Sequence, residues 1–154
     1  LRLLERTPLL WGVDPAASAV AGYAAHALST HAGVVCDAAP FPQAGTRQAL
    51  WQAAVAATSG SDVFADPDEL DASSLRLRAF LLAVLDEEAG GLDPARRALS
   101  GADVLAPAEE LGDAGRVPAI CAAALCLRFE LAALYLGLAA GKLGGSSAVT
   151  SAPV

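Results

Sequence analysis

The chain has 154 residues, a formal net charge of −7 and a hydrophobic content of 55%, in which alanine outweighs isoleucine and the aromatic residues. This length fits one domain with a core that needs neither disulfides nor metals. The negative charge and the scatter of the basic residues exclude nucleic acids and anionic membrane surfaces as partners, because clustered Lys and Arg hold both.

The N-terminal part of the chain alternates a short apolar run with a helical segment, the pattern of a βαβ series. Residues 8–13 predict a strand buried on both faces, because no polar residue alternates with the apolar ones. Asp14 is then a helix N-cap and Pro15 takes the first helical position, so we expect a helix that runs to about residue 30. This helix is apolar almost all round, which predicts that other elements cover it on both sides.

A second strand and a second helix are predicted before residue 59. Residues 33–36 form the strand, and two prolines within residues 37–42 predict a loop, because proline interrupts a helix. Residues 43–58 have apolar residues at helical spacing, with Leu50 and Trp51 on the inner face.

The remaining elements continue the alternation up to a long apolar helix. Residues 59–74 predict an acidic loop, and residues 78–85 predict a strand. A short helix follows at 93–101, which starts at Asp-Pro and stops at Gly, and another strand at 102–105. The long helix is predicted at 117–140 and a disordered tail at 144–154.

Four strands that alternate with four helices predict an α/β fold. We expect a three-layer, doubly wound parallel sheet of four to five strands, flavodoxin-like, as a single domain over residues 1–143. The helix at 117–140 is long and apolar enough to span a membrane, but Arg128 and Glu130 lie near its middle on different faces. We therefore predict a buried or interface helix and no membrane partner.

The three cysteines, Cys36, Cys121 and Cys126, have no CxxC spacing and no His-rich partner segment. They predict reduced, buried thiols in a reducing compartment rather than a redox or metal site. Charges at positions 2, 5 and 6 interrupt any apolar leader, so we expect a cytoplasmic protein. The chain begins with Leu and contains no Met, which suggests a piece of a longer protein.

Ligands of doubly wound sheets bind at the carboxyl ends of the strands, so the segment after the first strand is the leading candidate site. Gly12, Asp14 and Ser18 lie there, at a helix N-terminus that suits a phosphate or sugar oxygen. The alternative is an ordinary capped helix, because Asp14 already offers a carboxylate to the free N–H groups. His31 is the more accessible of the two histidines and the candidate base, the alternative being a surface histidine.

Two acidic clusters, at residues 66–69 and 86–88, raise the question of a metal site. Consecutive carboxylates beside proline or after a strand are typical of solvated loop charge. We therefore expect no metal site and no cofactor.

The order and spacing of several short motifs resemble the second sugar-isomerase (SIS) domain of bifunctional phosphoglucose/phosphomannose isomerases. The likeness spans about residues 7–141, and the alanine-rich composition suggests an actinobacterial branch. It rests on PLLWG at 8–12, a small-residue helix at 16–29, THAG at 30–33, FPQA at 41–44, FADPD at 64–68, the strand at 78–85 and ELAALYL at 130–136.

The resemblance implies aldose–ketose isomerisation of hexose 6-phosphates (glucose, mannose or fructose 6-phosphate), or a part in such an enzyme. It implies a sugar-phosphate ligand bound by Gln43 and Arg47 together with the segment after the first strand, and a partner that is a second SIS domain or a second copy. The family has Pro-Glu-Ala where this chain has Pro42-Gln43-Ala44, and Gln cannot act as a base. If turnover survives, His31 or a partner subunit must supply the base.

That departure keeps two alternatives open. The chain is either a sugar-phosphate-binding module that has lost the catalytic carboxylate, or a structural dimerisation module. The helices predicted at 16–29 and 117–140 favour the dimerisation module, because both are too apolar for the surface of a lone domain.

Overall fold

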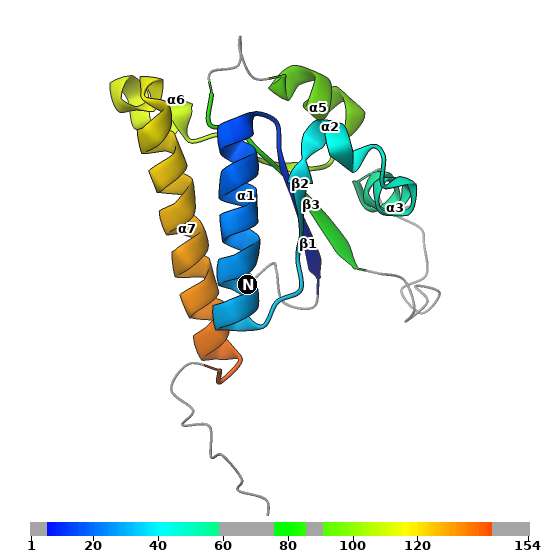
Figure 1. The fold of residues 1–154 in the computed structure, drawn as a ribbon, viewed down its shortest axis with the longest axis vertical. Helices are drawn as coiled ribbons and strands as arrows, with labels where there is room; N and C mark the ends of the chain where they lie inside the picture. Colours follow the sequence, from blue (N-terminus) through cyan, green and yellow to red (C-terminus); the bar gives the residue numbers. More distant parts are fainter. Residues whose placement is uncertain (1–5, 59–75, 86–90, 143–154) are drawn as a thin grey trace, which may run out of the picture.

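A four-stranded parallel sheet in the order β2-β1-β3-β4 forms the centre of the computed structural model (Figure 1). The structure describes residues 6–58, 76–85 and 91–142. The predicted α/β class with a parallel sheet is confirmed, with four strands in the described part of the chain. The strands β1 to β4 are Thr7–Gly12, Asp37–Pro40, Leu77–Leu82 and Asp103–Leu105.

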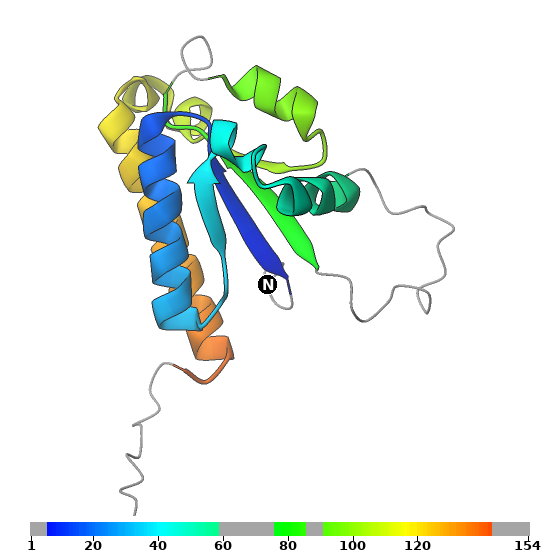
Figure 2. The same cartoon turned by 45° about the vertical axis from the view of Figure 1, so that its right-hand side comes forward.

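Helices cover both faces of the sheet, which gives the three predicted layers (Figures 1 and 2). On one face lie α1 (Pro15–Ala27), a π-helical turn (Leu28–Ala32) and α7 (Pro118–Ala139). On the other face lie α2 (Phe41–Ala44), α3 (Gln48–Thr58) and α5 (Leu92–Ala98). Before α7, the chain forms α6 (Ala108–Leu111) and a 3-10 turn (Gly112–Arg116).

The central strand β1 divides its side chains between two cores. Leu9, Leu10 and Trp11 are fully buried. Leu10 packs in the core beneath α1 and α7, whereas Leu9 and Trp11 pack in the core beneath α3 and α5. Because successive strand residues point to opposite faces, an uninterrupted apolar run is what a strand between two helical layers requires.

The second strand begins four residues later than predicted. Gly33 has a left-handed backbone (φ 63°) that ends the π-helical turn, and the ladder starts only where Asp37 lies opposite Leu9. The predicted loop over residues 37–42 is therefore wrong. β2 is an edge strand, so Pro40 can close it without breaking a shared ladder.

Two predicted helices also differ from the structure. The one expected at 43–58 is split into α2 and α3, with a turn whose Thr46 and Arg47 amides bond back to α2 carbonyls. The helix expected from residue 93 begins at Leu92, and its N-cap is the left-handed Gly91. The helix predicted at 117–140 is confirmed as α7. The predictions for residues 59–74, 86–88 and 144–154 lie outside the described residues.

Candidate functional site

The buried carboxylate of Asp14 joins the carboxyl ends of β1 and β3. Only 5% of Asp14 is exposed. Its Oδ1 accepts the Ala17 N–H at 2.7 Å, and its Oδ2 accepts the N–H groups of Val84 at 2.8 Å and Leu85 at 3.1 Å. The strand order reverses between β1 and β3, and doubly wound sheets usually open a ligand crevice there. In this chain Asp14 fills that position.

Gly12 and Ser18 belong to the same junction. The Ser18 hydroxyl donates to the carbonyl oxygens of Asp14 at 2.8 Å and Gly12 at 3.3 Å. A Cβ on residue 12 would lie 2.2 Å from the Ser18 nitrogen, so only glycine allows β1 and α1 to approach this closely. The structure thus brings Gly12, Asp14 and Ser18 together, but their polar groups bond the chain's own backbone, as in an ordinary capped helix.

The structure does not bring the candidate base His31 to the segment that contains Asp14. Asp14 precedes α1, and His31 lies in the π-helical turn that follows it. The two residues are 17 positions apart along continuous helix, which separates them by about 25 Å at 1.5 Å per residue. Figure 1 shows α1 running the length of the sheet, so His31, which is half-buried, lies at the amino ends of the strands.

Gln43 and Arg47 lie on the side of the sheet that α2 and α3 cover. Gln43 is exposed, and its main-chain carbonyl accepts the Thr46 hydroxyl at 2.7 Å. Arg47 forms an ion pair with Asp37, whose other oxygen accepts the Trp11 Nε1–H at 3.2 Å. Arg47 therefore ties the α2–α3 turn to β2.

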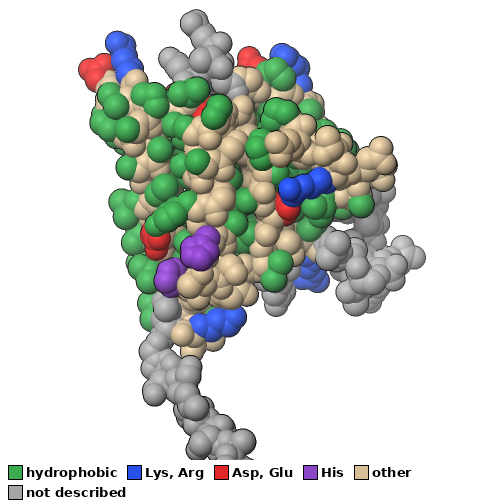
Figure 3. Space-filling view, viewed as in Figure 1, with side chains coloured by type: hydrophobic (Ala, Val, Ile, Leu, Met, Phe, Trp, Pro, Cys, Tyr) green, Lys and Arg blue, Asp and Glu red, His purple; other side chains and the backbone are tan. Residues whose placement is uncertain are grey.

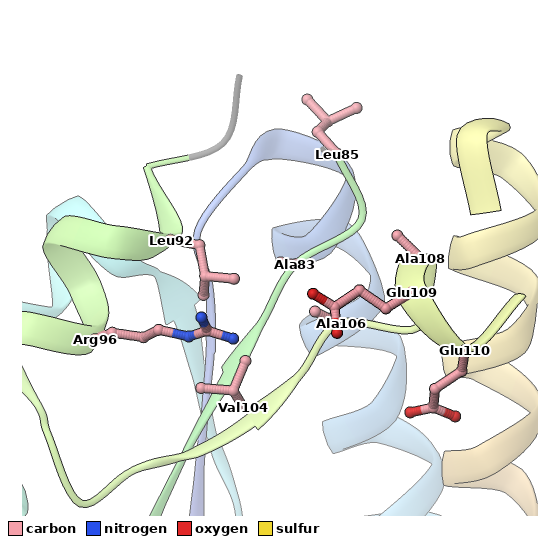
Figure 4. Close-up of a pocket in the computed structure, with 9 residues that line it drawn as sticks. All are labelled: Ala83, Leu85, Leu92, Arg96, Val104, Ala106, Ala108, Glu109 and Glu110. Atoms are coloured by element: carbon pink, nitrogen blue, oxygen red, sulfur yellow. The ribbon is translucent and has the colours of Figure 1, made fainter. Parts of the chain in front are cut away.

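A cavity that the sequence analysis missed lies at the carboxyl ends of β3 and β4 (Figure 4). Its volume is about 270 Å³. Arg96 on α5 and Glu109 on α6 point toward one another across it (Figure 4). The third charged residue is Glu110, which pairs with Arg128 of α7. The apolar wall consists of Ala83, Leu85, Leu92, Val104, Ala106 and Ala108.

This cavity combines complementary polar groups with an apolar wall. A guanidinium offers planar, paired donors to a phosphate or carboxylate. A carboxylate accepts hydrogen bonds from hydroxyl groups and can take a proton from carbon. A volume of about 270 Å³, just below the usual range for ligand pockets, suits a ligand of sugar size rather than a dinucleotide. The sequence did carry a signal, because Glu109 lies four residues after the end of the fourth predicted strand.

The thiols do not assemble a site in the described part of the chain. Cys36, Cys121 and Cys126 are free, and Cys121 donates to the Gly115 carbonyl at 3.1 Å. Burial raises the pKa of the Cys36 thiol to about 11, so it is protonated at neutral pH. No cluster of His, Cys, Asp or Glu that could hold a metal ion occurs among the described residues.

Comparison with known proteins adds no relative to this description. No family model, no curated protein and no solved structure matches the chain. The chemistry of the cavity and the motif resemblance are therefore the basis for a functional proposal.

Proposed function

We propose that this chain is a SIS-type α/β domain that binds a hexose 6-phosphate in the cavity at the carboxyl ends of β3 and β4. The observation that carries the proposal is the opposition of Arg96 and Glu109 across that cavity (Figure 4). The strand order β2-β1-β3-β4 supports it, because flavodoxin-like sheets have the same order over their first four strands.

Arg96 and Glu109 bind different parts of the ligand. The phosphate faces Arg96, because a guanidinium binds phosphate oxygens with paired, charge-assisted hydrogen bonds. The sugar hydroxyls donate to Glu109, and the apolar wall covers the C–H face of the ring. Glu110 stays with Arg128, so one carboxylate rather than two faces the anionic ligand.

None of the site residues expected from the sequence brings a base to this cavity. Asp14 accepts three backbone hydrogen bonds at the β1–β3 junction, His31 lies at the other edge of the sheet, and Gln43 cannot take a proton. Isomerisation is a second candidate function, because Glu109 is a carboxylate that faces the cavity and could act as the base that moves a proton between C1 and C2.

Binding is tested by adding glucose, mannose or fructose 6-phosphate to the chain and measuring its melting temperature and ligand affinity. A ligand that binds the folded state at 100 times its Kd stabilises it by about 2.7 kcal/mol, which corresponds to a rise of roughly 5–10 °C for a domain of this size. Glucose without phosphate, and inorganic phosphate alone, should give smaller shifts, because each satisfies one half of the site.

The matched variants are Arg96→Gln and Arg97→Gln, neighbours on α5 of which only Arg96 lines the cavity. Loss of a charge-assisted contact should weaken hexose 6-phosphate binding about 10- to 100-fold in Arg96→Gln and leave Arg97→Gln unchanged. Equal effects of the two variants, or no shift with any hexose phosphate, would refute the proposal. Deuterium exchange at the sugar C2 that is lost in Glu109→Gln would identify an isomerase, and binding without exchange would identify a binding domain.

A further inference from the structure

Helix α7 has two apolar faces on opposite sides. One face packs against α1 and the π-helical turn through buried residues such as Leu125 and Phe129. The other is largely exposed: 61% of Leu127 and Leu138 and 46% of Leu131 are accessible. We call it the exposed seam, and it consists of Val117, Ile120, Ala124, Leu127, Leu131, Leu134 and Leu138. In Figure 3, hydrophobic side chains follow α7 along its length.

The spacing of the seam is that of a coiled coil. Its residues follow one another in strict steps of three and four, which is the a/d pattern of a heptad repeat. Val117 is the extended residue before the helix, and within α7 the alternation runs from the d site 120 to the a site 138, almost three heptads. An apolar a/d pattern of about this length is a sequence signal of a coiled coil. A period of 3.5 residues keeps a seam facing another helix, so the pattern specifies a helical partner.

The charged residues of α7 lie beside the seam and pair with other residues of the same domain. Arg128 and Glu130 are the only charged residues of this helix. Arg128 pairs with Glu110 of α6 on one flank, and Glu130 accepts the Tyr23 hydroxyl of α1 on the other. By length and composition α7 could also cross a membrane. However, both charge pairs would have to enter the lipid or break, which favours a protein partner.

We infer that the exposed seam binds the same seam of a second copy, in antiparallel orientation and centred near Phe129. In this register each seam residue from Ile120 to Leu138 meets a seam residue of the partner: Leu127 faces the partner's Leu131, Ala124 faces the partner's Leu134, and Ile120 faces the partner's Leu138. A parallel pair would instead place Ala124 against itself and leave a void, whereas the antiparallel pair opposes small to large residues and also opposes the two helix dipoles. A two-fold axis needs one self-complementary patch, and the seam is such a patch.

The neighbouring helix α1 extends this interface. A helix about 33 Å long and 10–12 Å wide gives a footprint of roughly 350 Å², less than the roughly 800 Å² per partner of a standard interface. The exposed flank of α1, where Tyr23 is 44% accessible, lies beside the seam and supplies further area. The inference stands independently of the proposed ligand, because the cavity lies at the strand ends.

The test is the molar mass of the full chain by light scattering and sedimentation over a range of concentrations. The wild type should be a dimer, and Leu131→Glu should raise the dimer Kd at least 100-fold with unchanged circular dichroism. Val35→Glu, the same kind of change at a residue that is 76% exposed and off the seam, should leave the Kd unchanged. A monomeric wild type, a dimer that Leu131→Glu does not weaken, or a wild type that partitions into phosphatidylcholine vesicles would overturn the inference.

Disulfide crosslinking tests the orientation even if Leu131→Glu fails to fold. A Leu127→Cys chain mixed with a Leu131→Cys chain should form a crosslinked dimer on mild oxidation, more than either chain alone, with the wild type as the background for the native thiols. Crosslinking of each single variant with itself, without a gain on mixing, would contradict the antiparallel register.

Discussion

Replacing Asp14 should destabilise the domain more than any other single carboxylate change among the described residues. Asp14→Ala removes a helix N-cap, worth about 1 kcal/mol. It also leaves the Val84 and Leu85 N–H groups without their charged acceptor, which costs roughly 1–3 kcal/mol for each buried donor and less for the half-buried Leu85. The expected loss is therefore about 4 kcal/mol of unfolding free energy. Asp14→Asn keeps one acceptor oxygen for one side of the junction and should lose about half as much.

The assay is urea unfolding followed by tryptophan fluorescence, because Trp11 is fully buried and reports on the core. The midpoint should fall with an unchanged m value, since the surface exposed on unfolding stays the same. The matched control is Asp93→Ala, which removes an exposed carboxylate from the first turn of α5 and should cost less than about 1 kcal/mol. If Asp14→Ala costs no more than Asp93→Ala, the carboxylate does not hold β1, α1 and β3 together.

Two further predictions concern Gly12 and Cys36. Gly12→Ala should lower the free energy of unfolding by about 1–3 kcal/mol or more, because its methyl group would collide with the Ser18 backbone. Gly22→Ala, with open space on α1, should instead raise it by roughly 0.5–1 kcal/mol. Equal thermal unfolding of the two variants would contradict the close approach of β1 and α1. The pKa of the Cys36 thiol is raised from 9.0 to about 11, so its contribution to stability should be complete below pH 9 and be lost as the pH rises toward 11. Cys36→Ala should remove that part of the loss of stability at alkaline pH. Iodoacetamide should label Cys36 slowly at pH 8, and labelling as fast as that of free cysteine would refute the raised pKa.

Local signals were sufficient for the elements that one residue pair or one long run specifies. Asp14-Pro15 fixes the start of α1, and the unbroken apolar run before it fixes β1. The long helix α7 was predicted to within two residues. The second strand could not be placed this way, because its position depends on where Gly33 ends the π-helical turn and on which residue pairs with Leu9. Those are tertiary effects that propensity does not record.

The candidate site was predictable in principle and partly missed for a geometric reason. In a parallel sheet, residues that follow a strand lie at the carboxyl edge, whereas residues that precede the next strand lie at the amino edge. Asp14 follows β1 and His31 precedes β2, so the two could not share a pocket once α1 spanned the sheet. Applied to β4, the same rule leads to Glu109. Arg96 is harder to find, because it reaches the cavity from the second turn of α5.

The closure of the β1–β3 junction by Asp14 explains why the cavity lies one strand further along. At the switch point the buried carboxylate already accepts the N–H groups of Ala17, Val84 and Leu85, so these donors are not available to an anionic ligand. The next junction, β3–β4, has no such residue among those described, and α5 and α6 place opposite charges across it. One ion pair, Glu110–Arg128, connects this region with the flank of the exposed seam. Both side chains are well exposed, and an exposed pair contributes at most about 1 kcal/mol, so the cavity and the seam are energetically almost separate features of one fold.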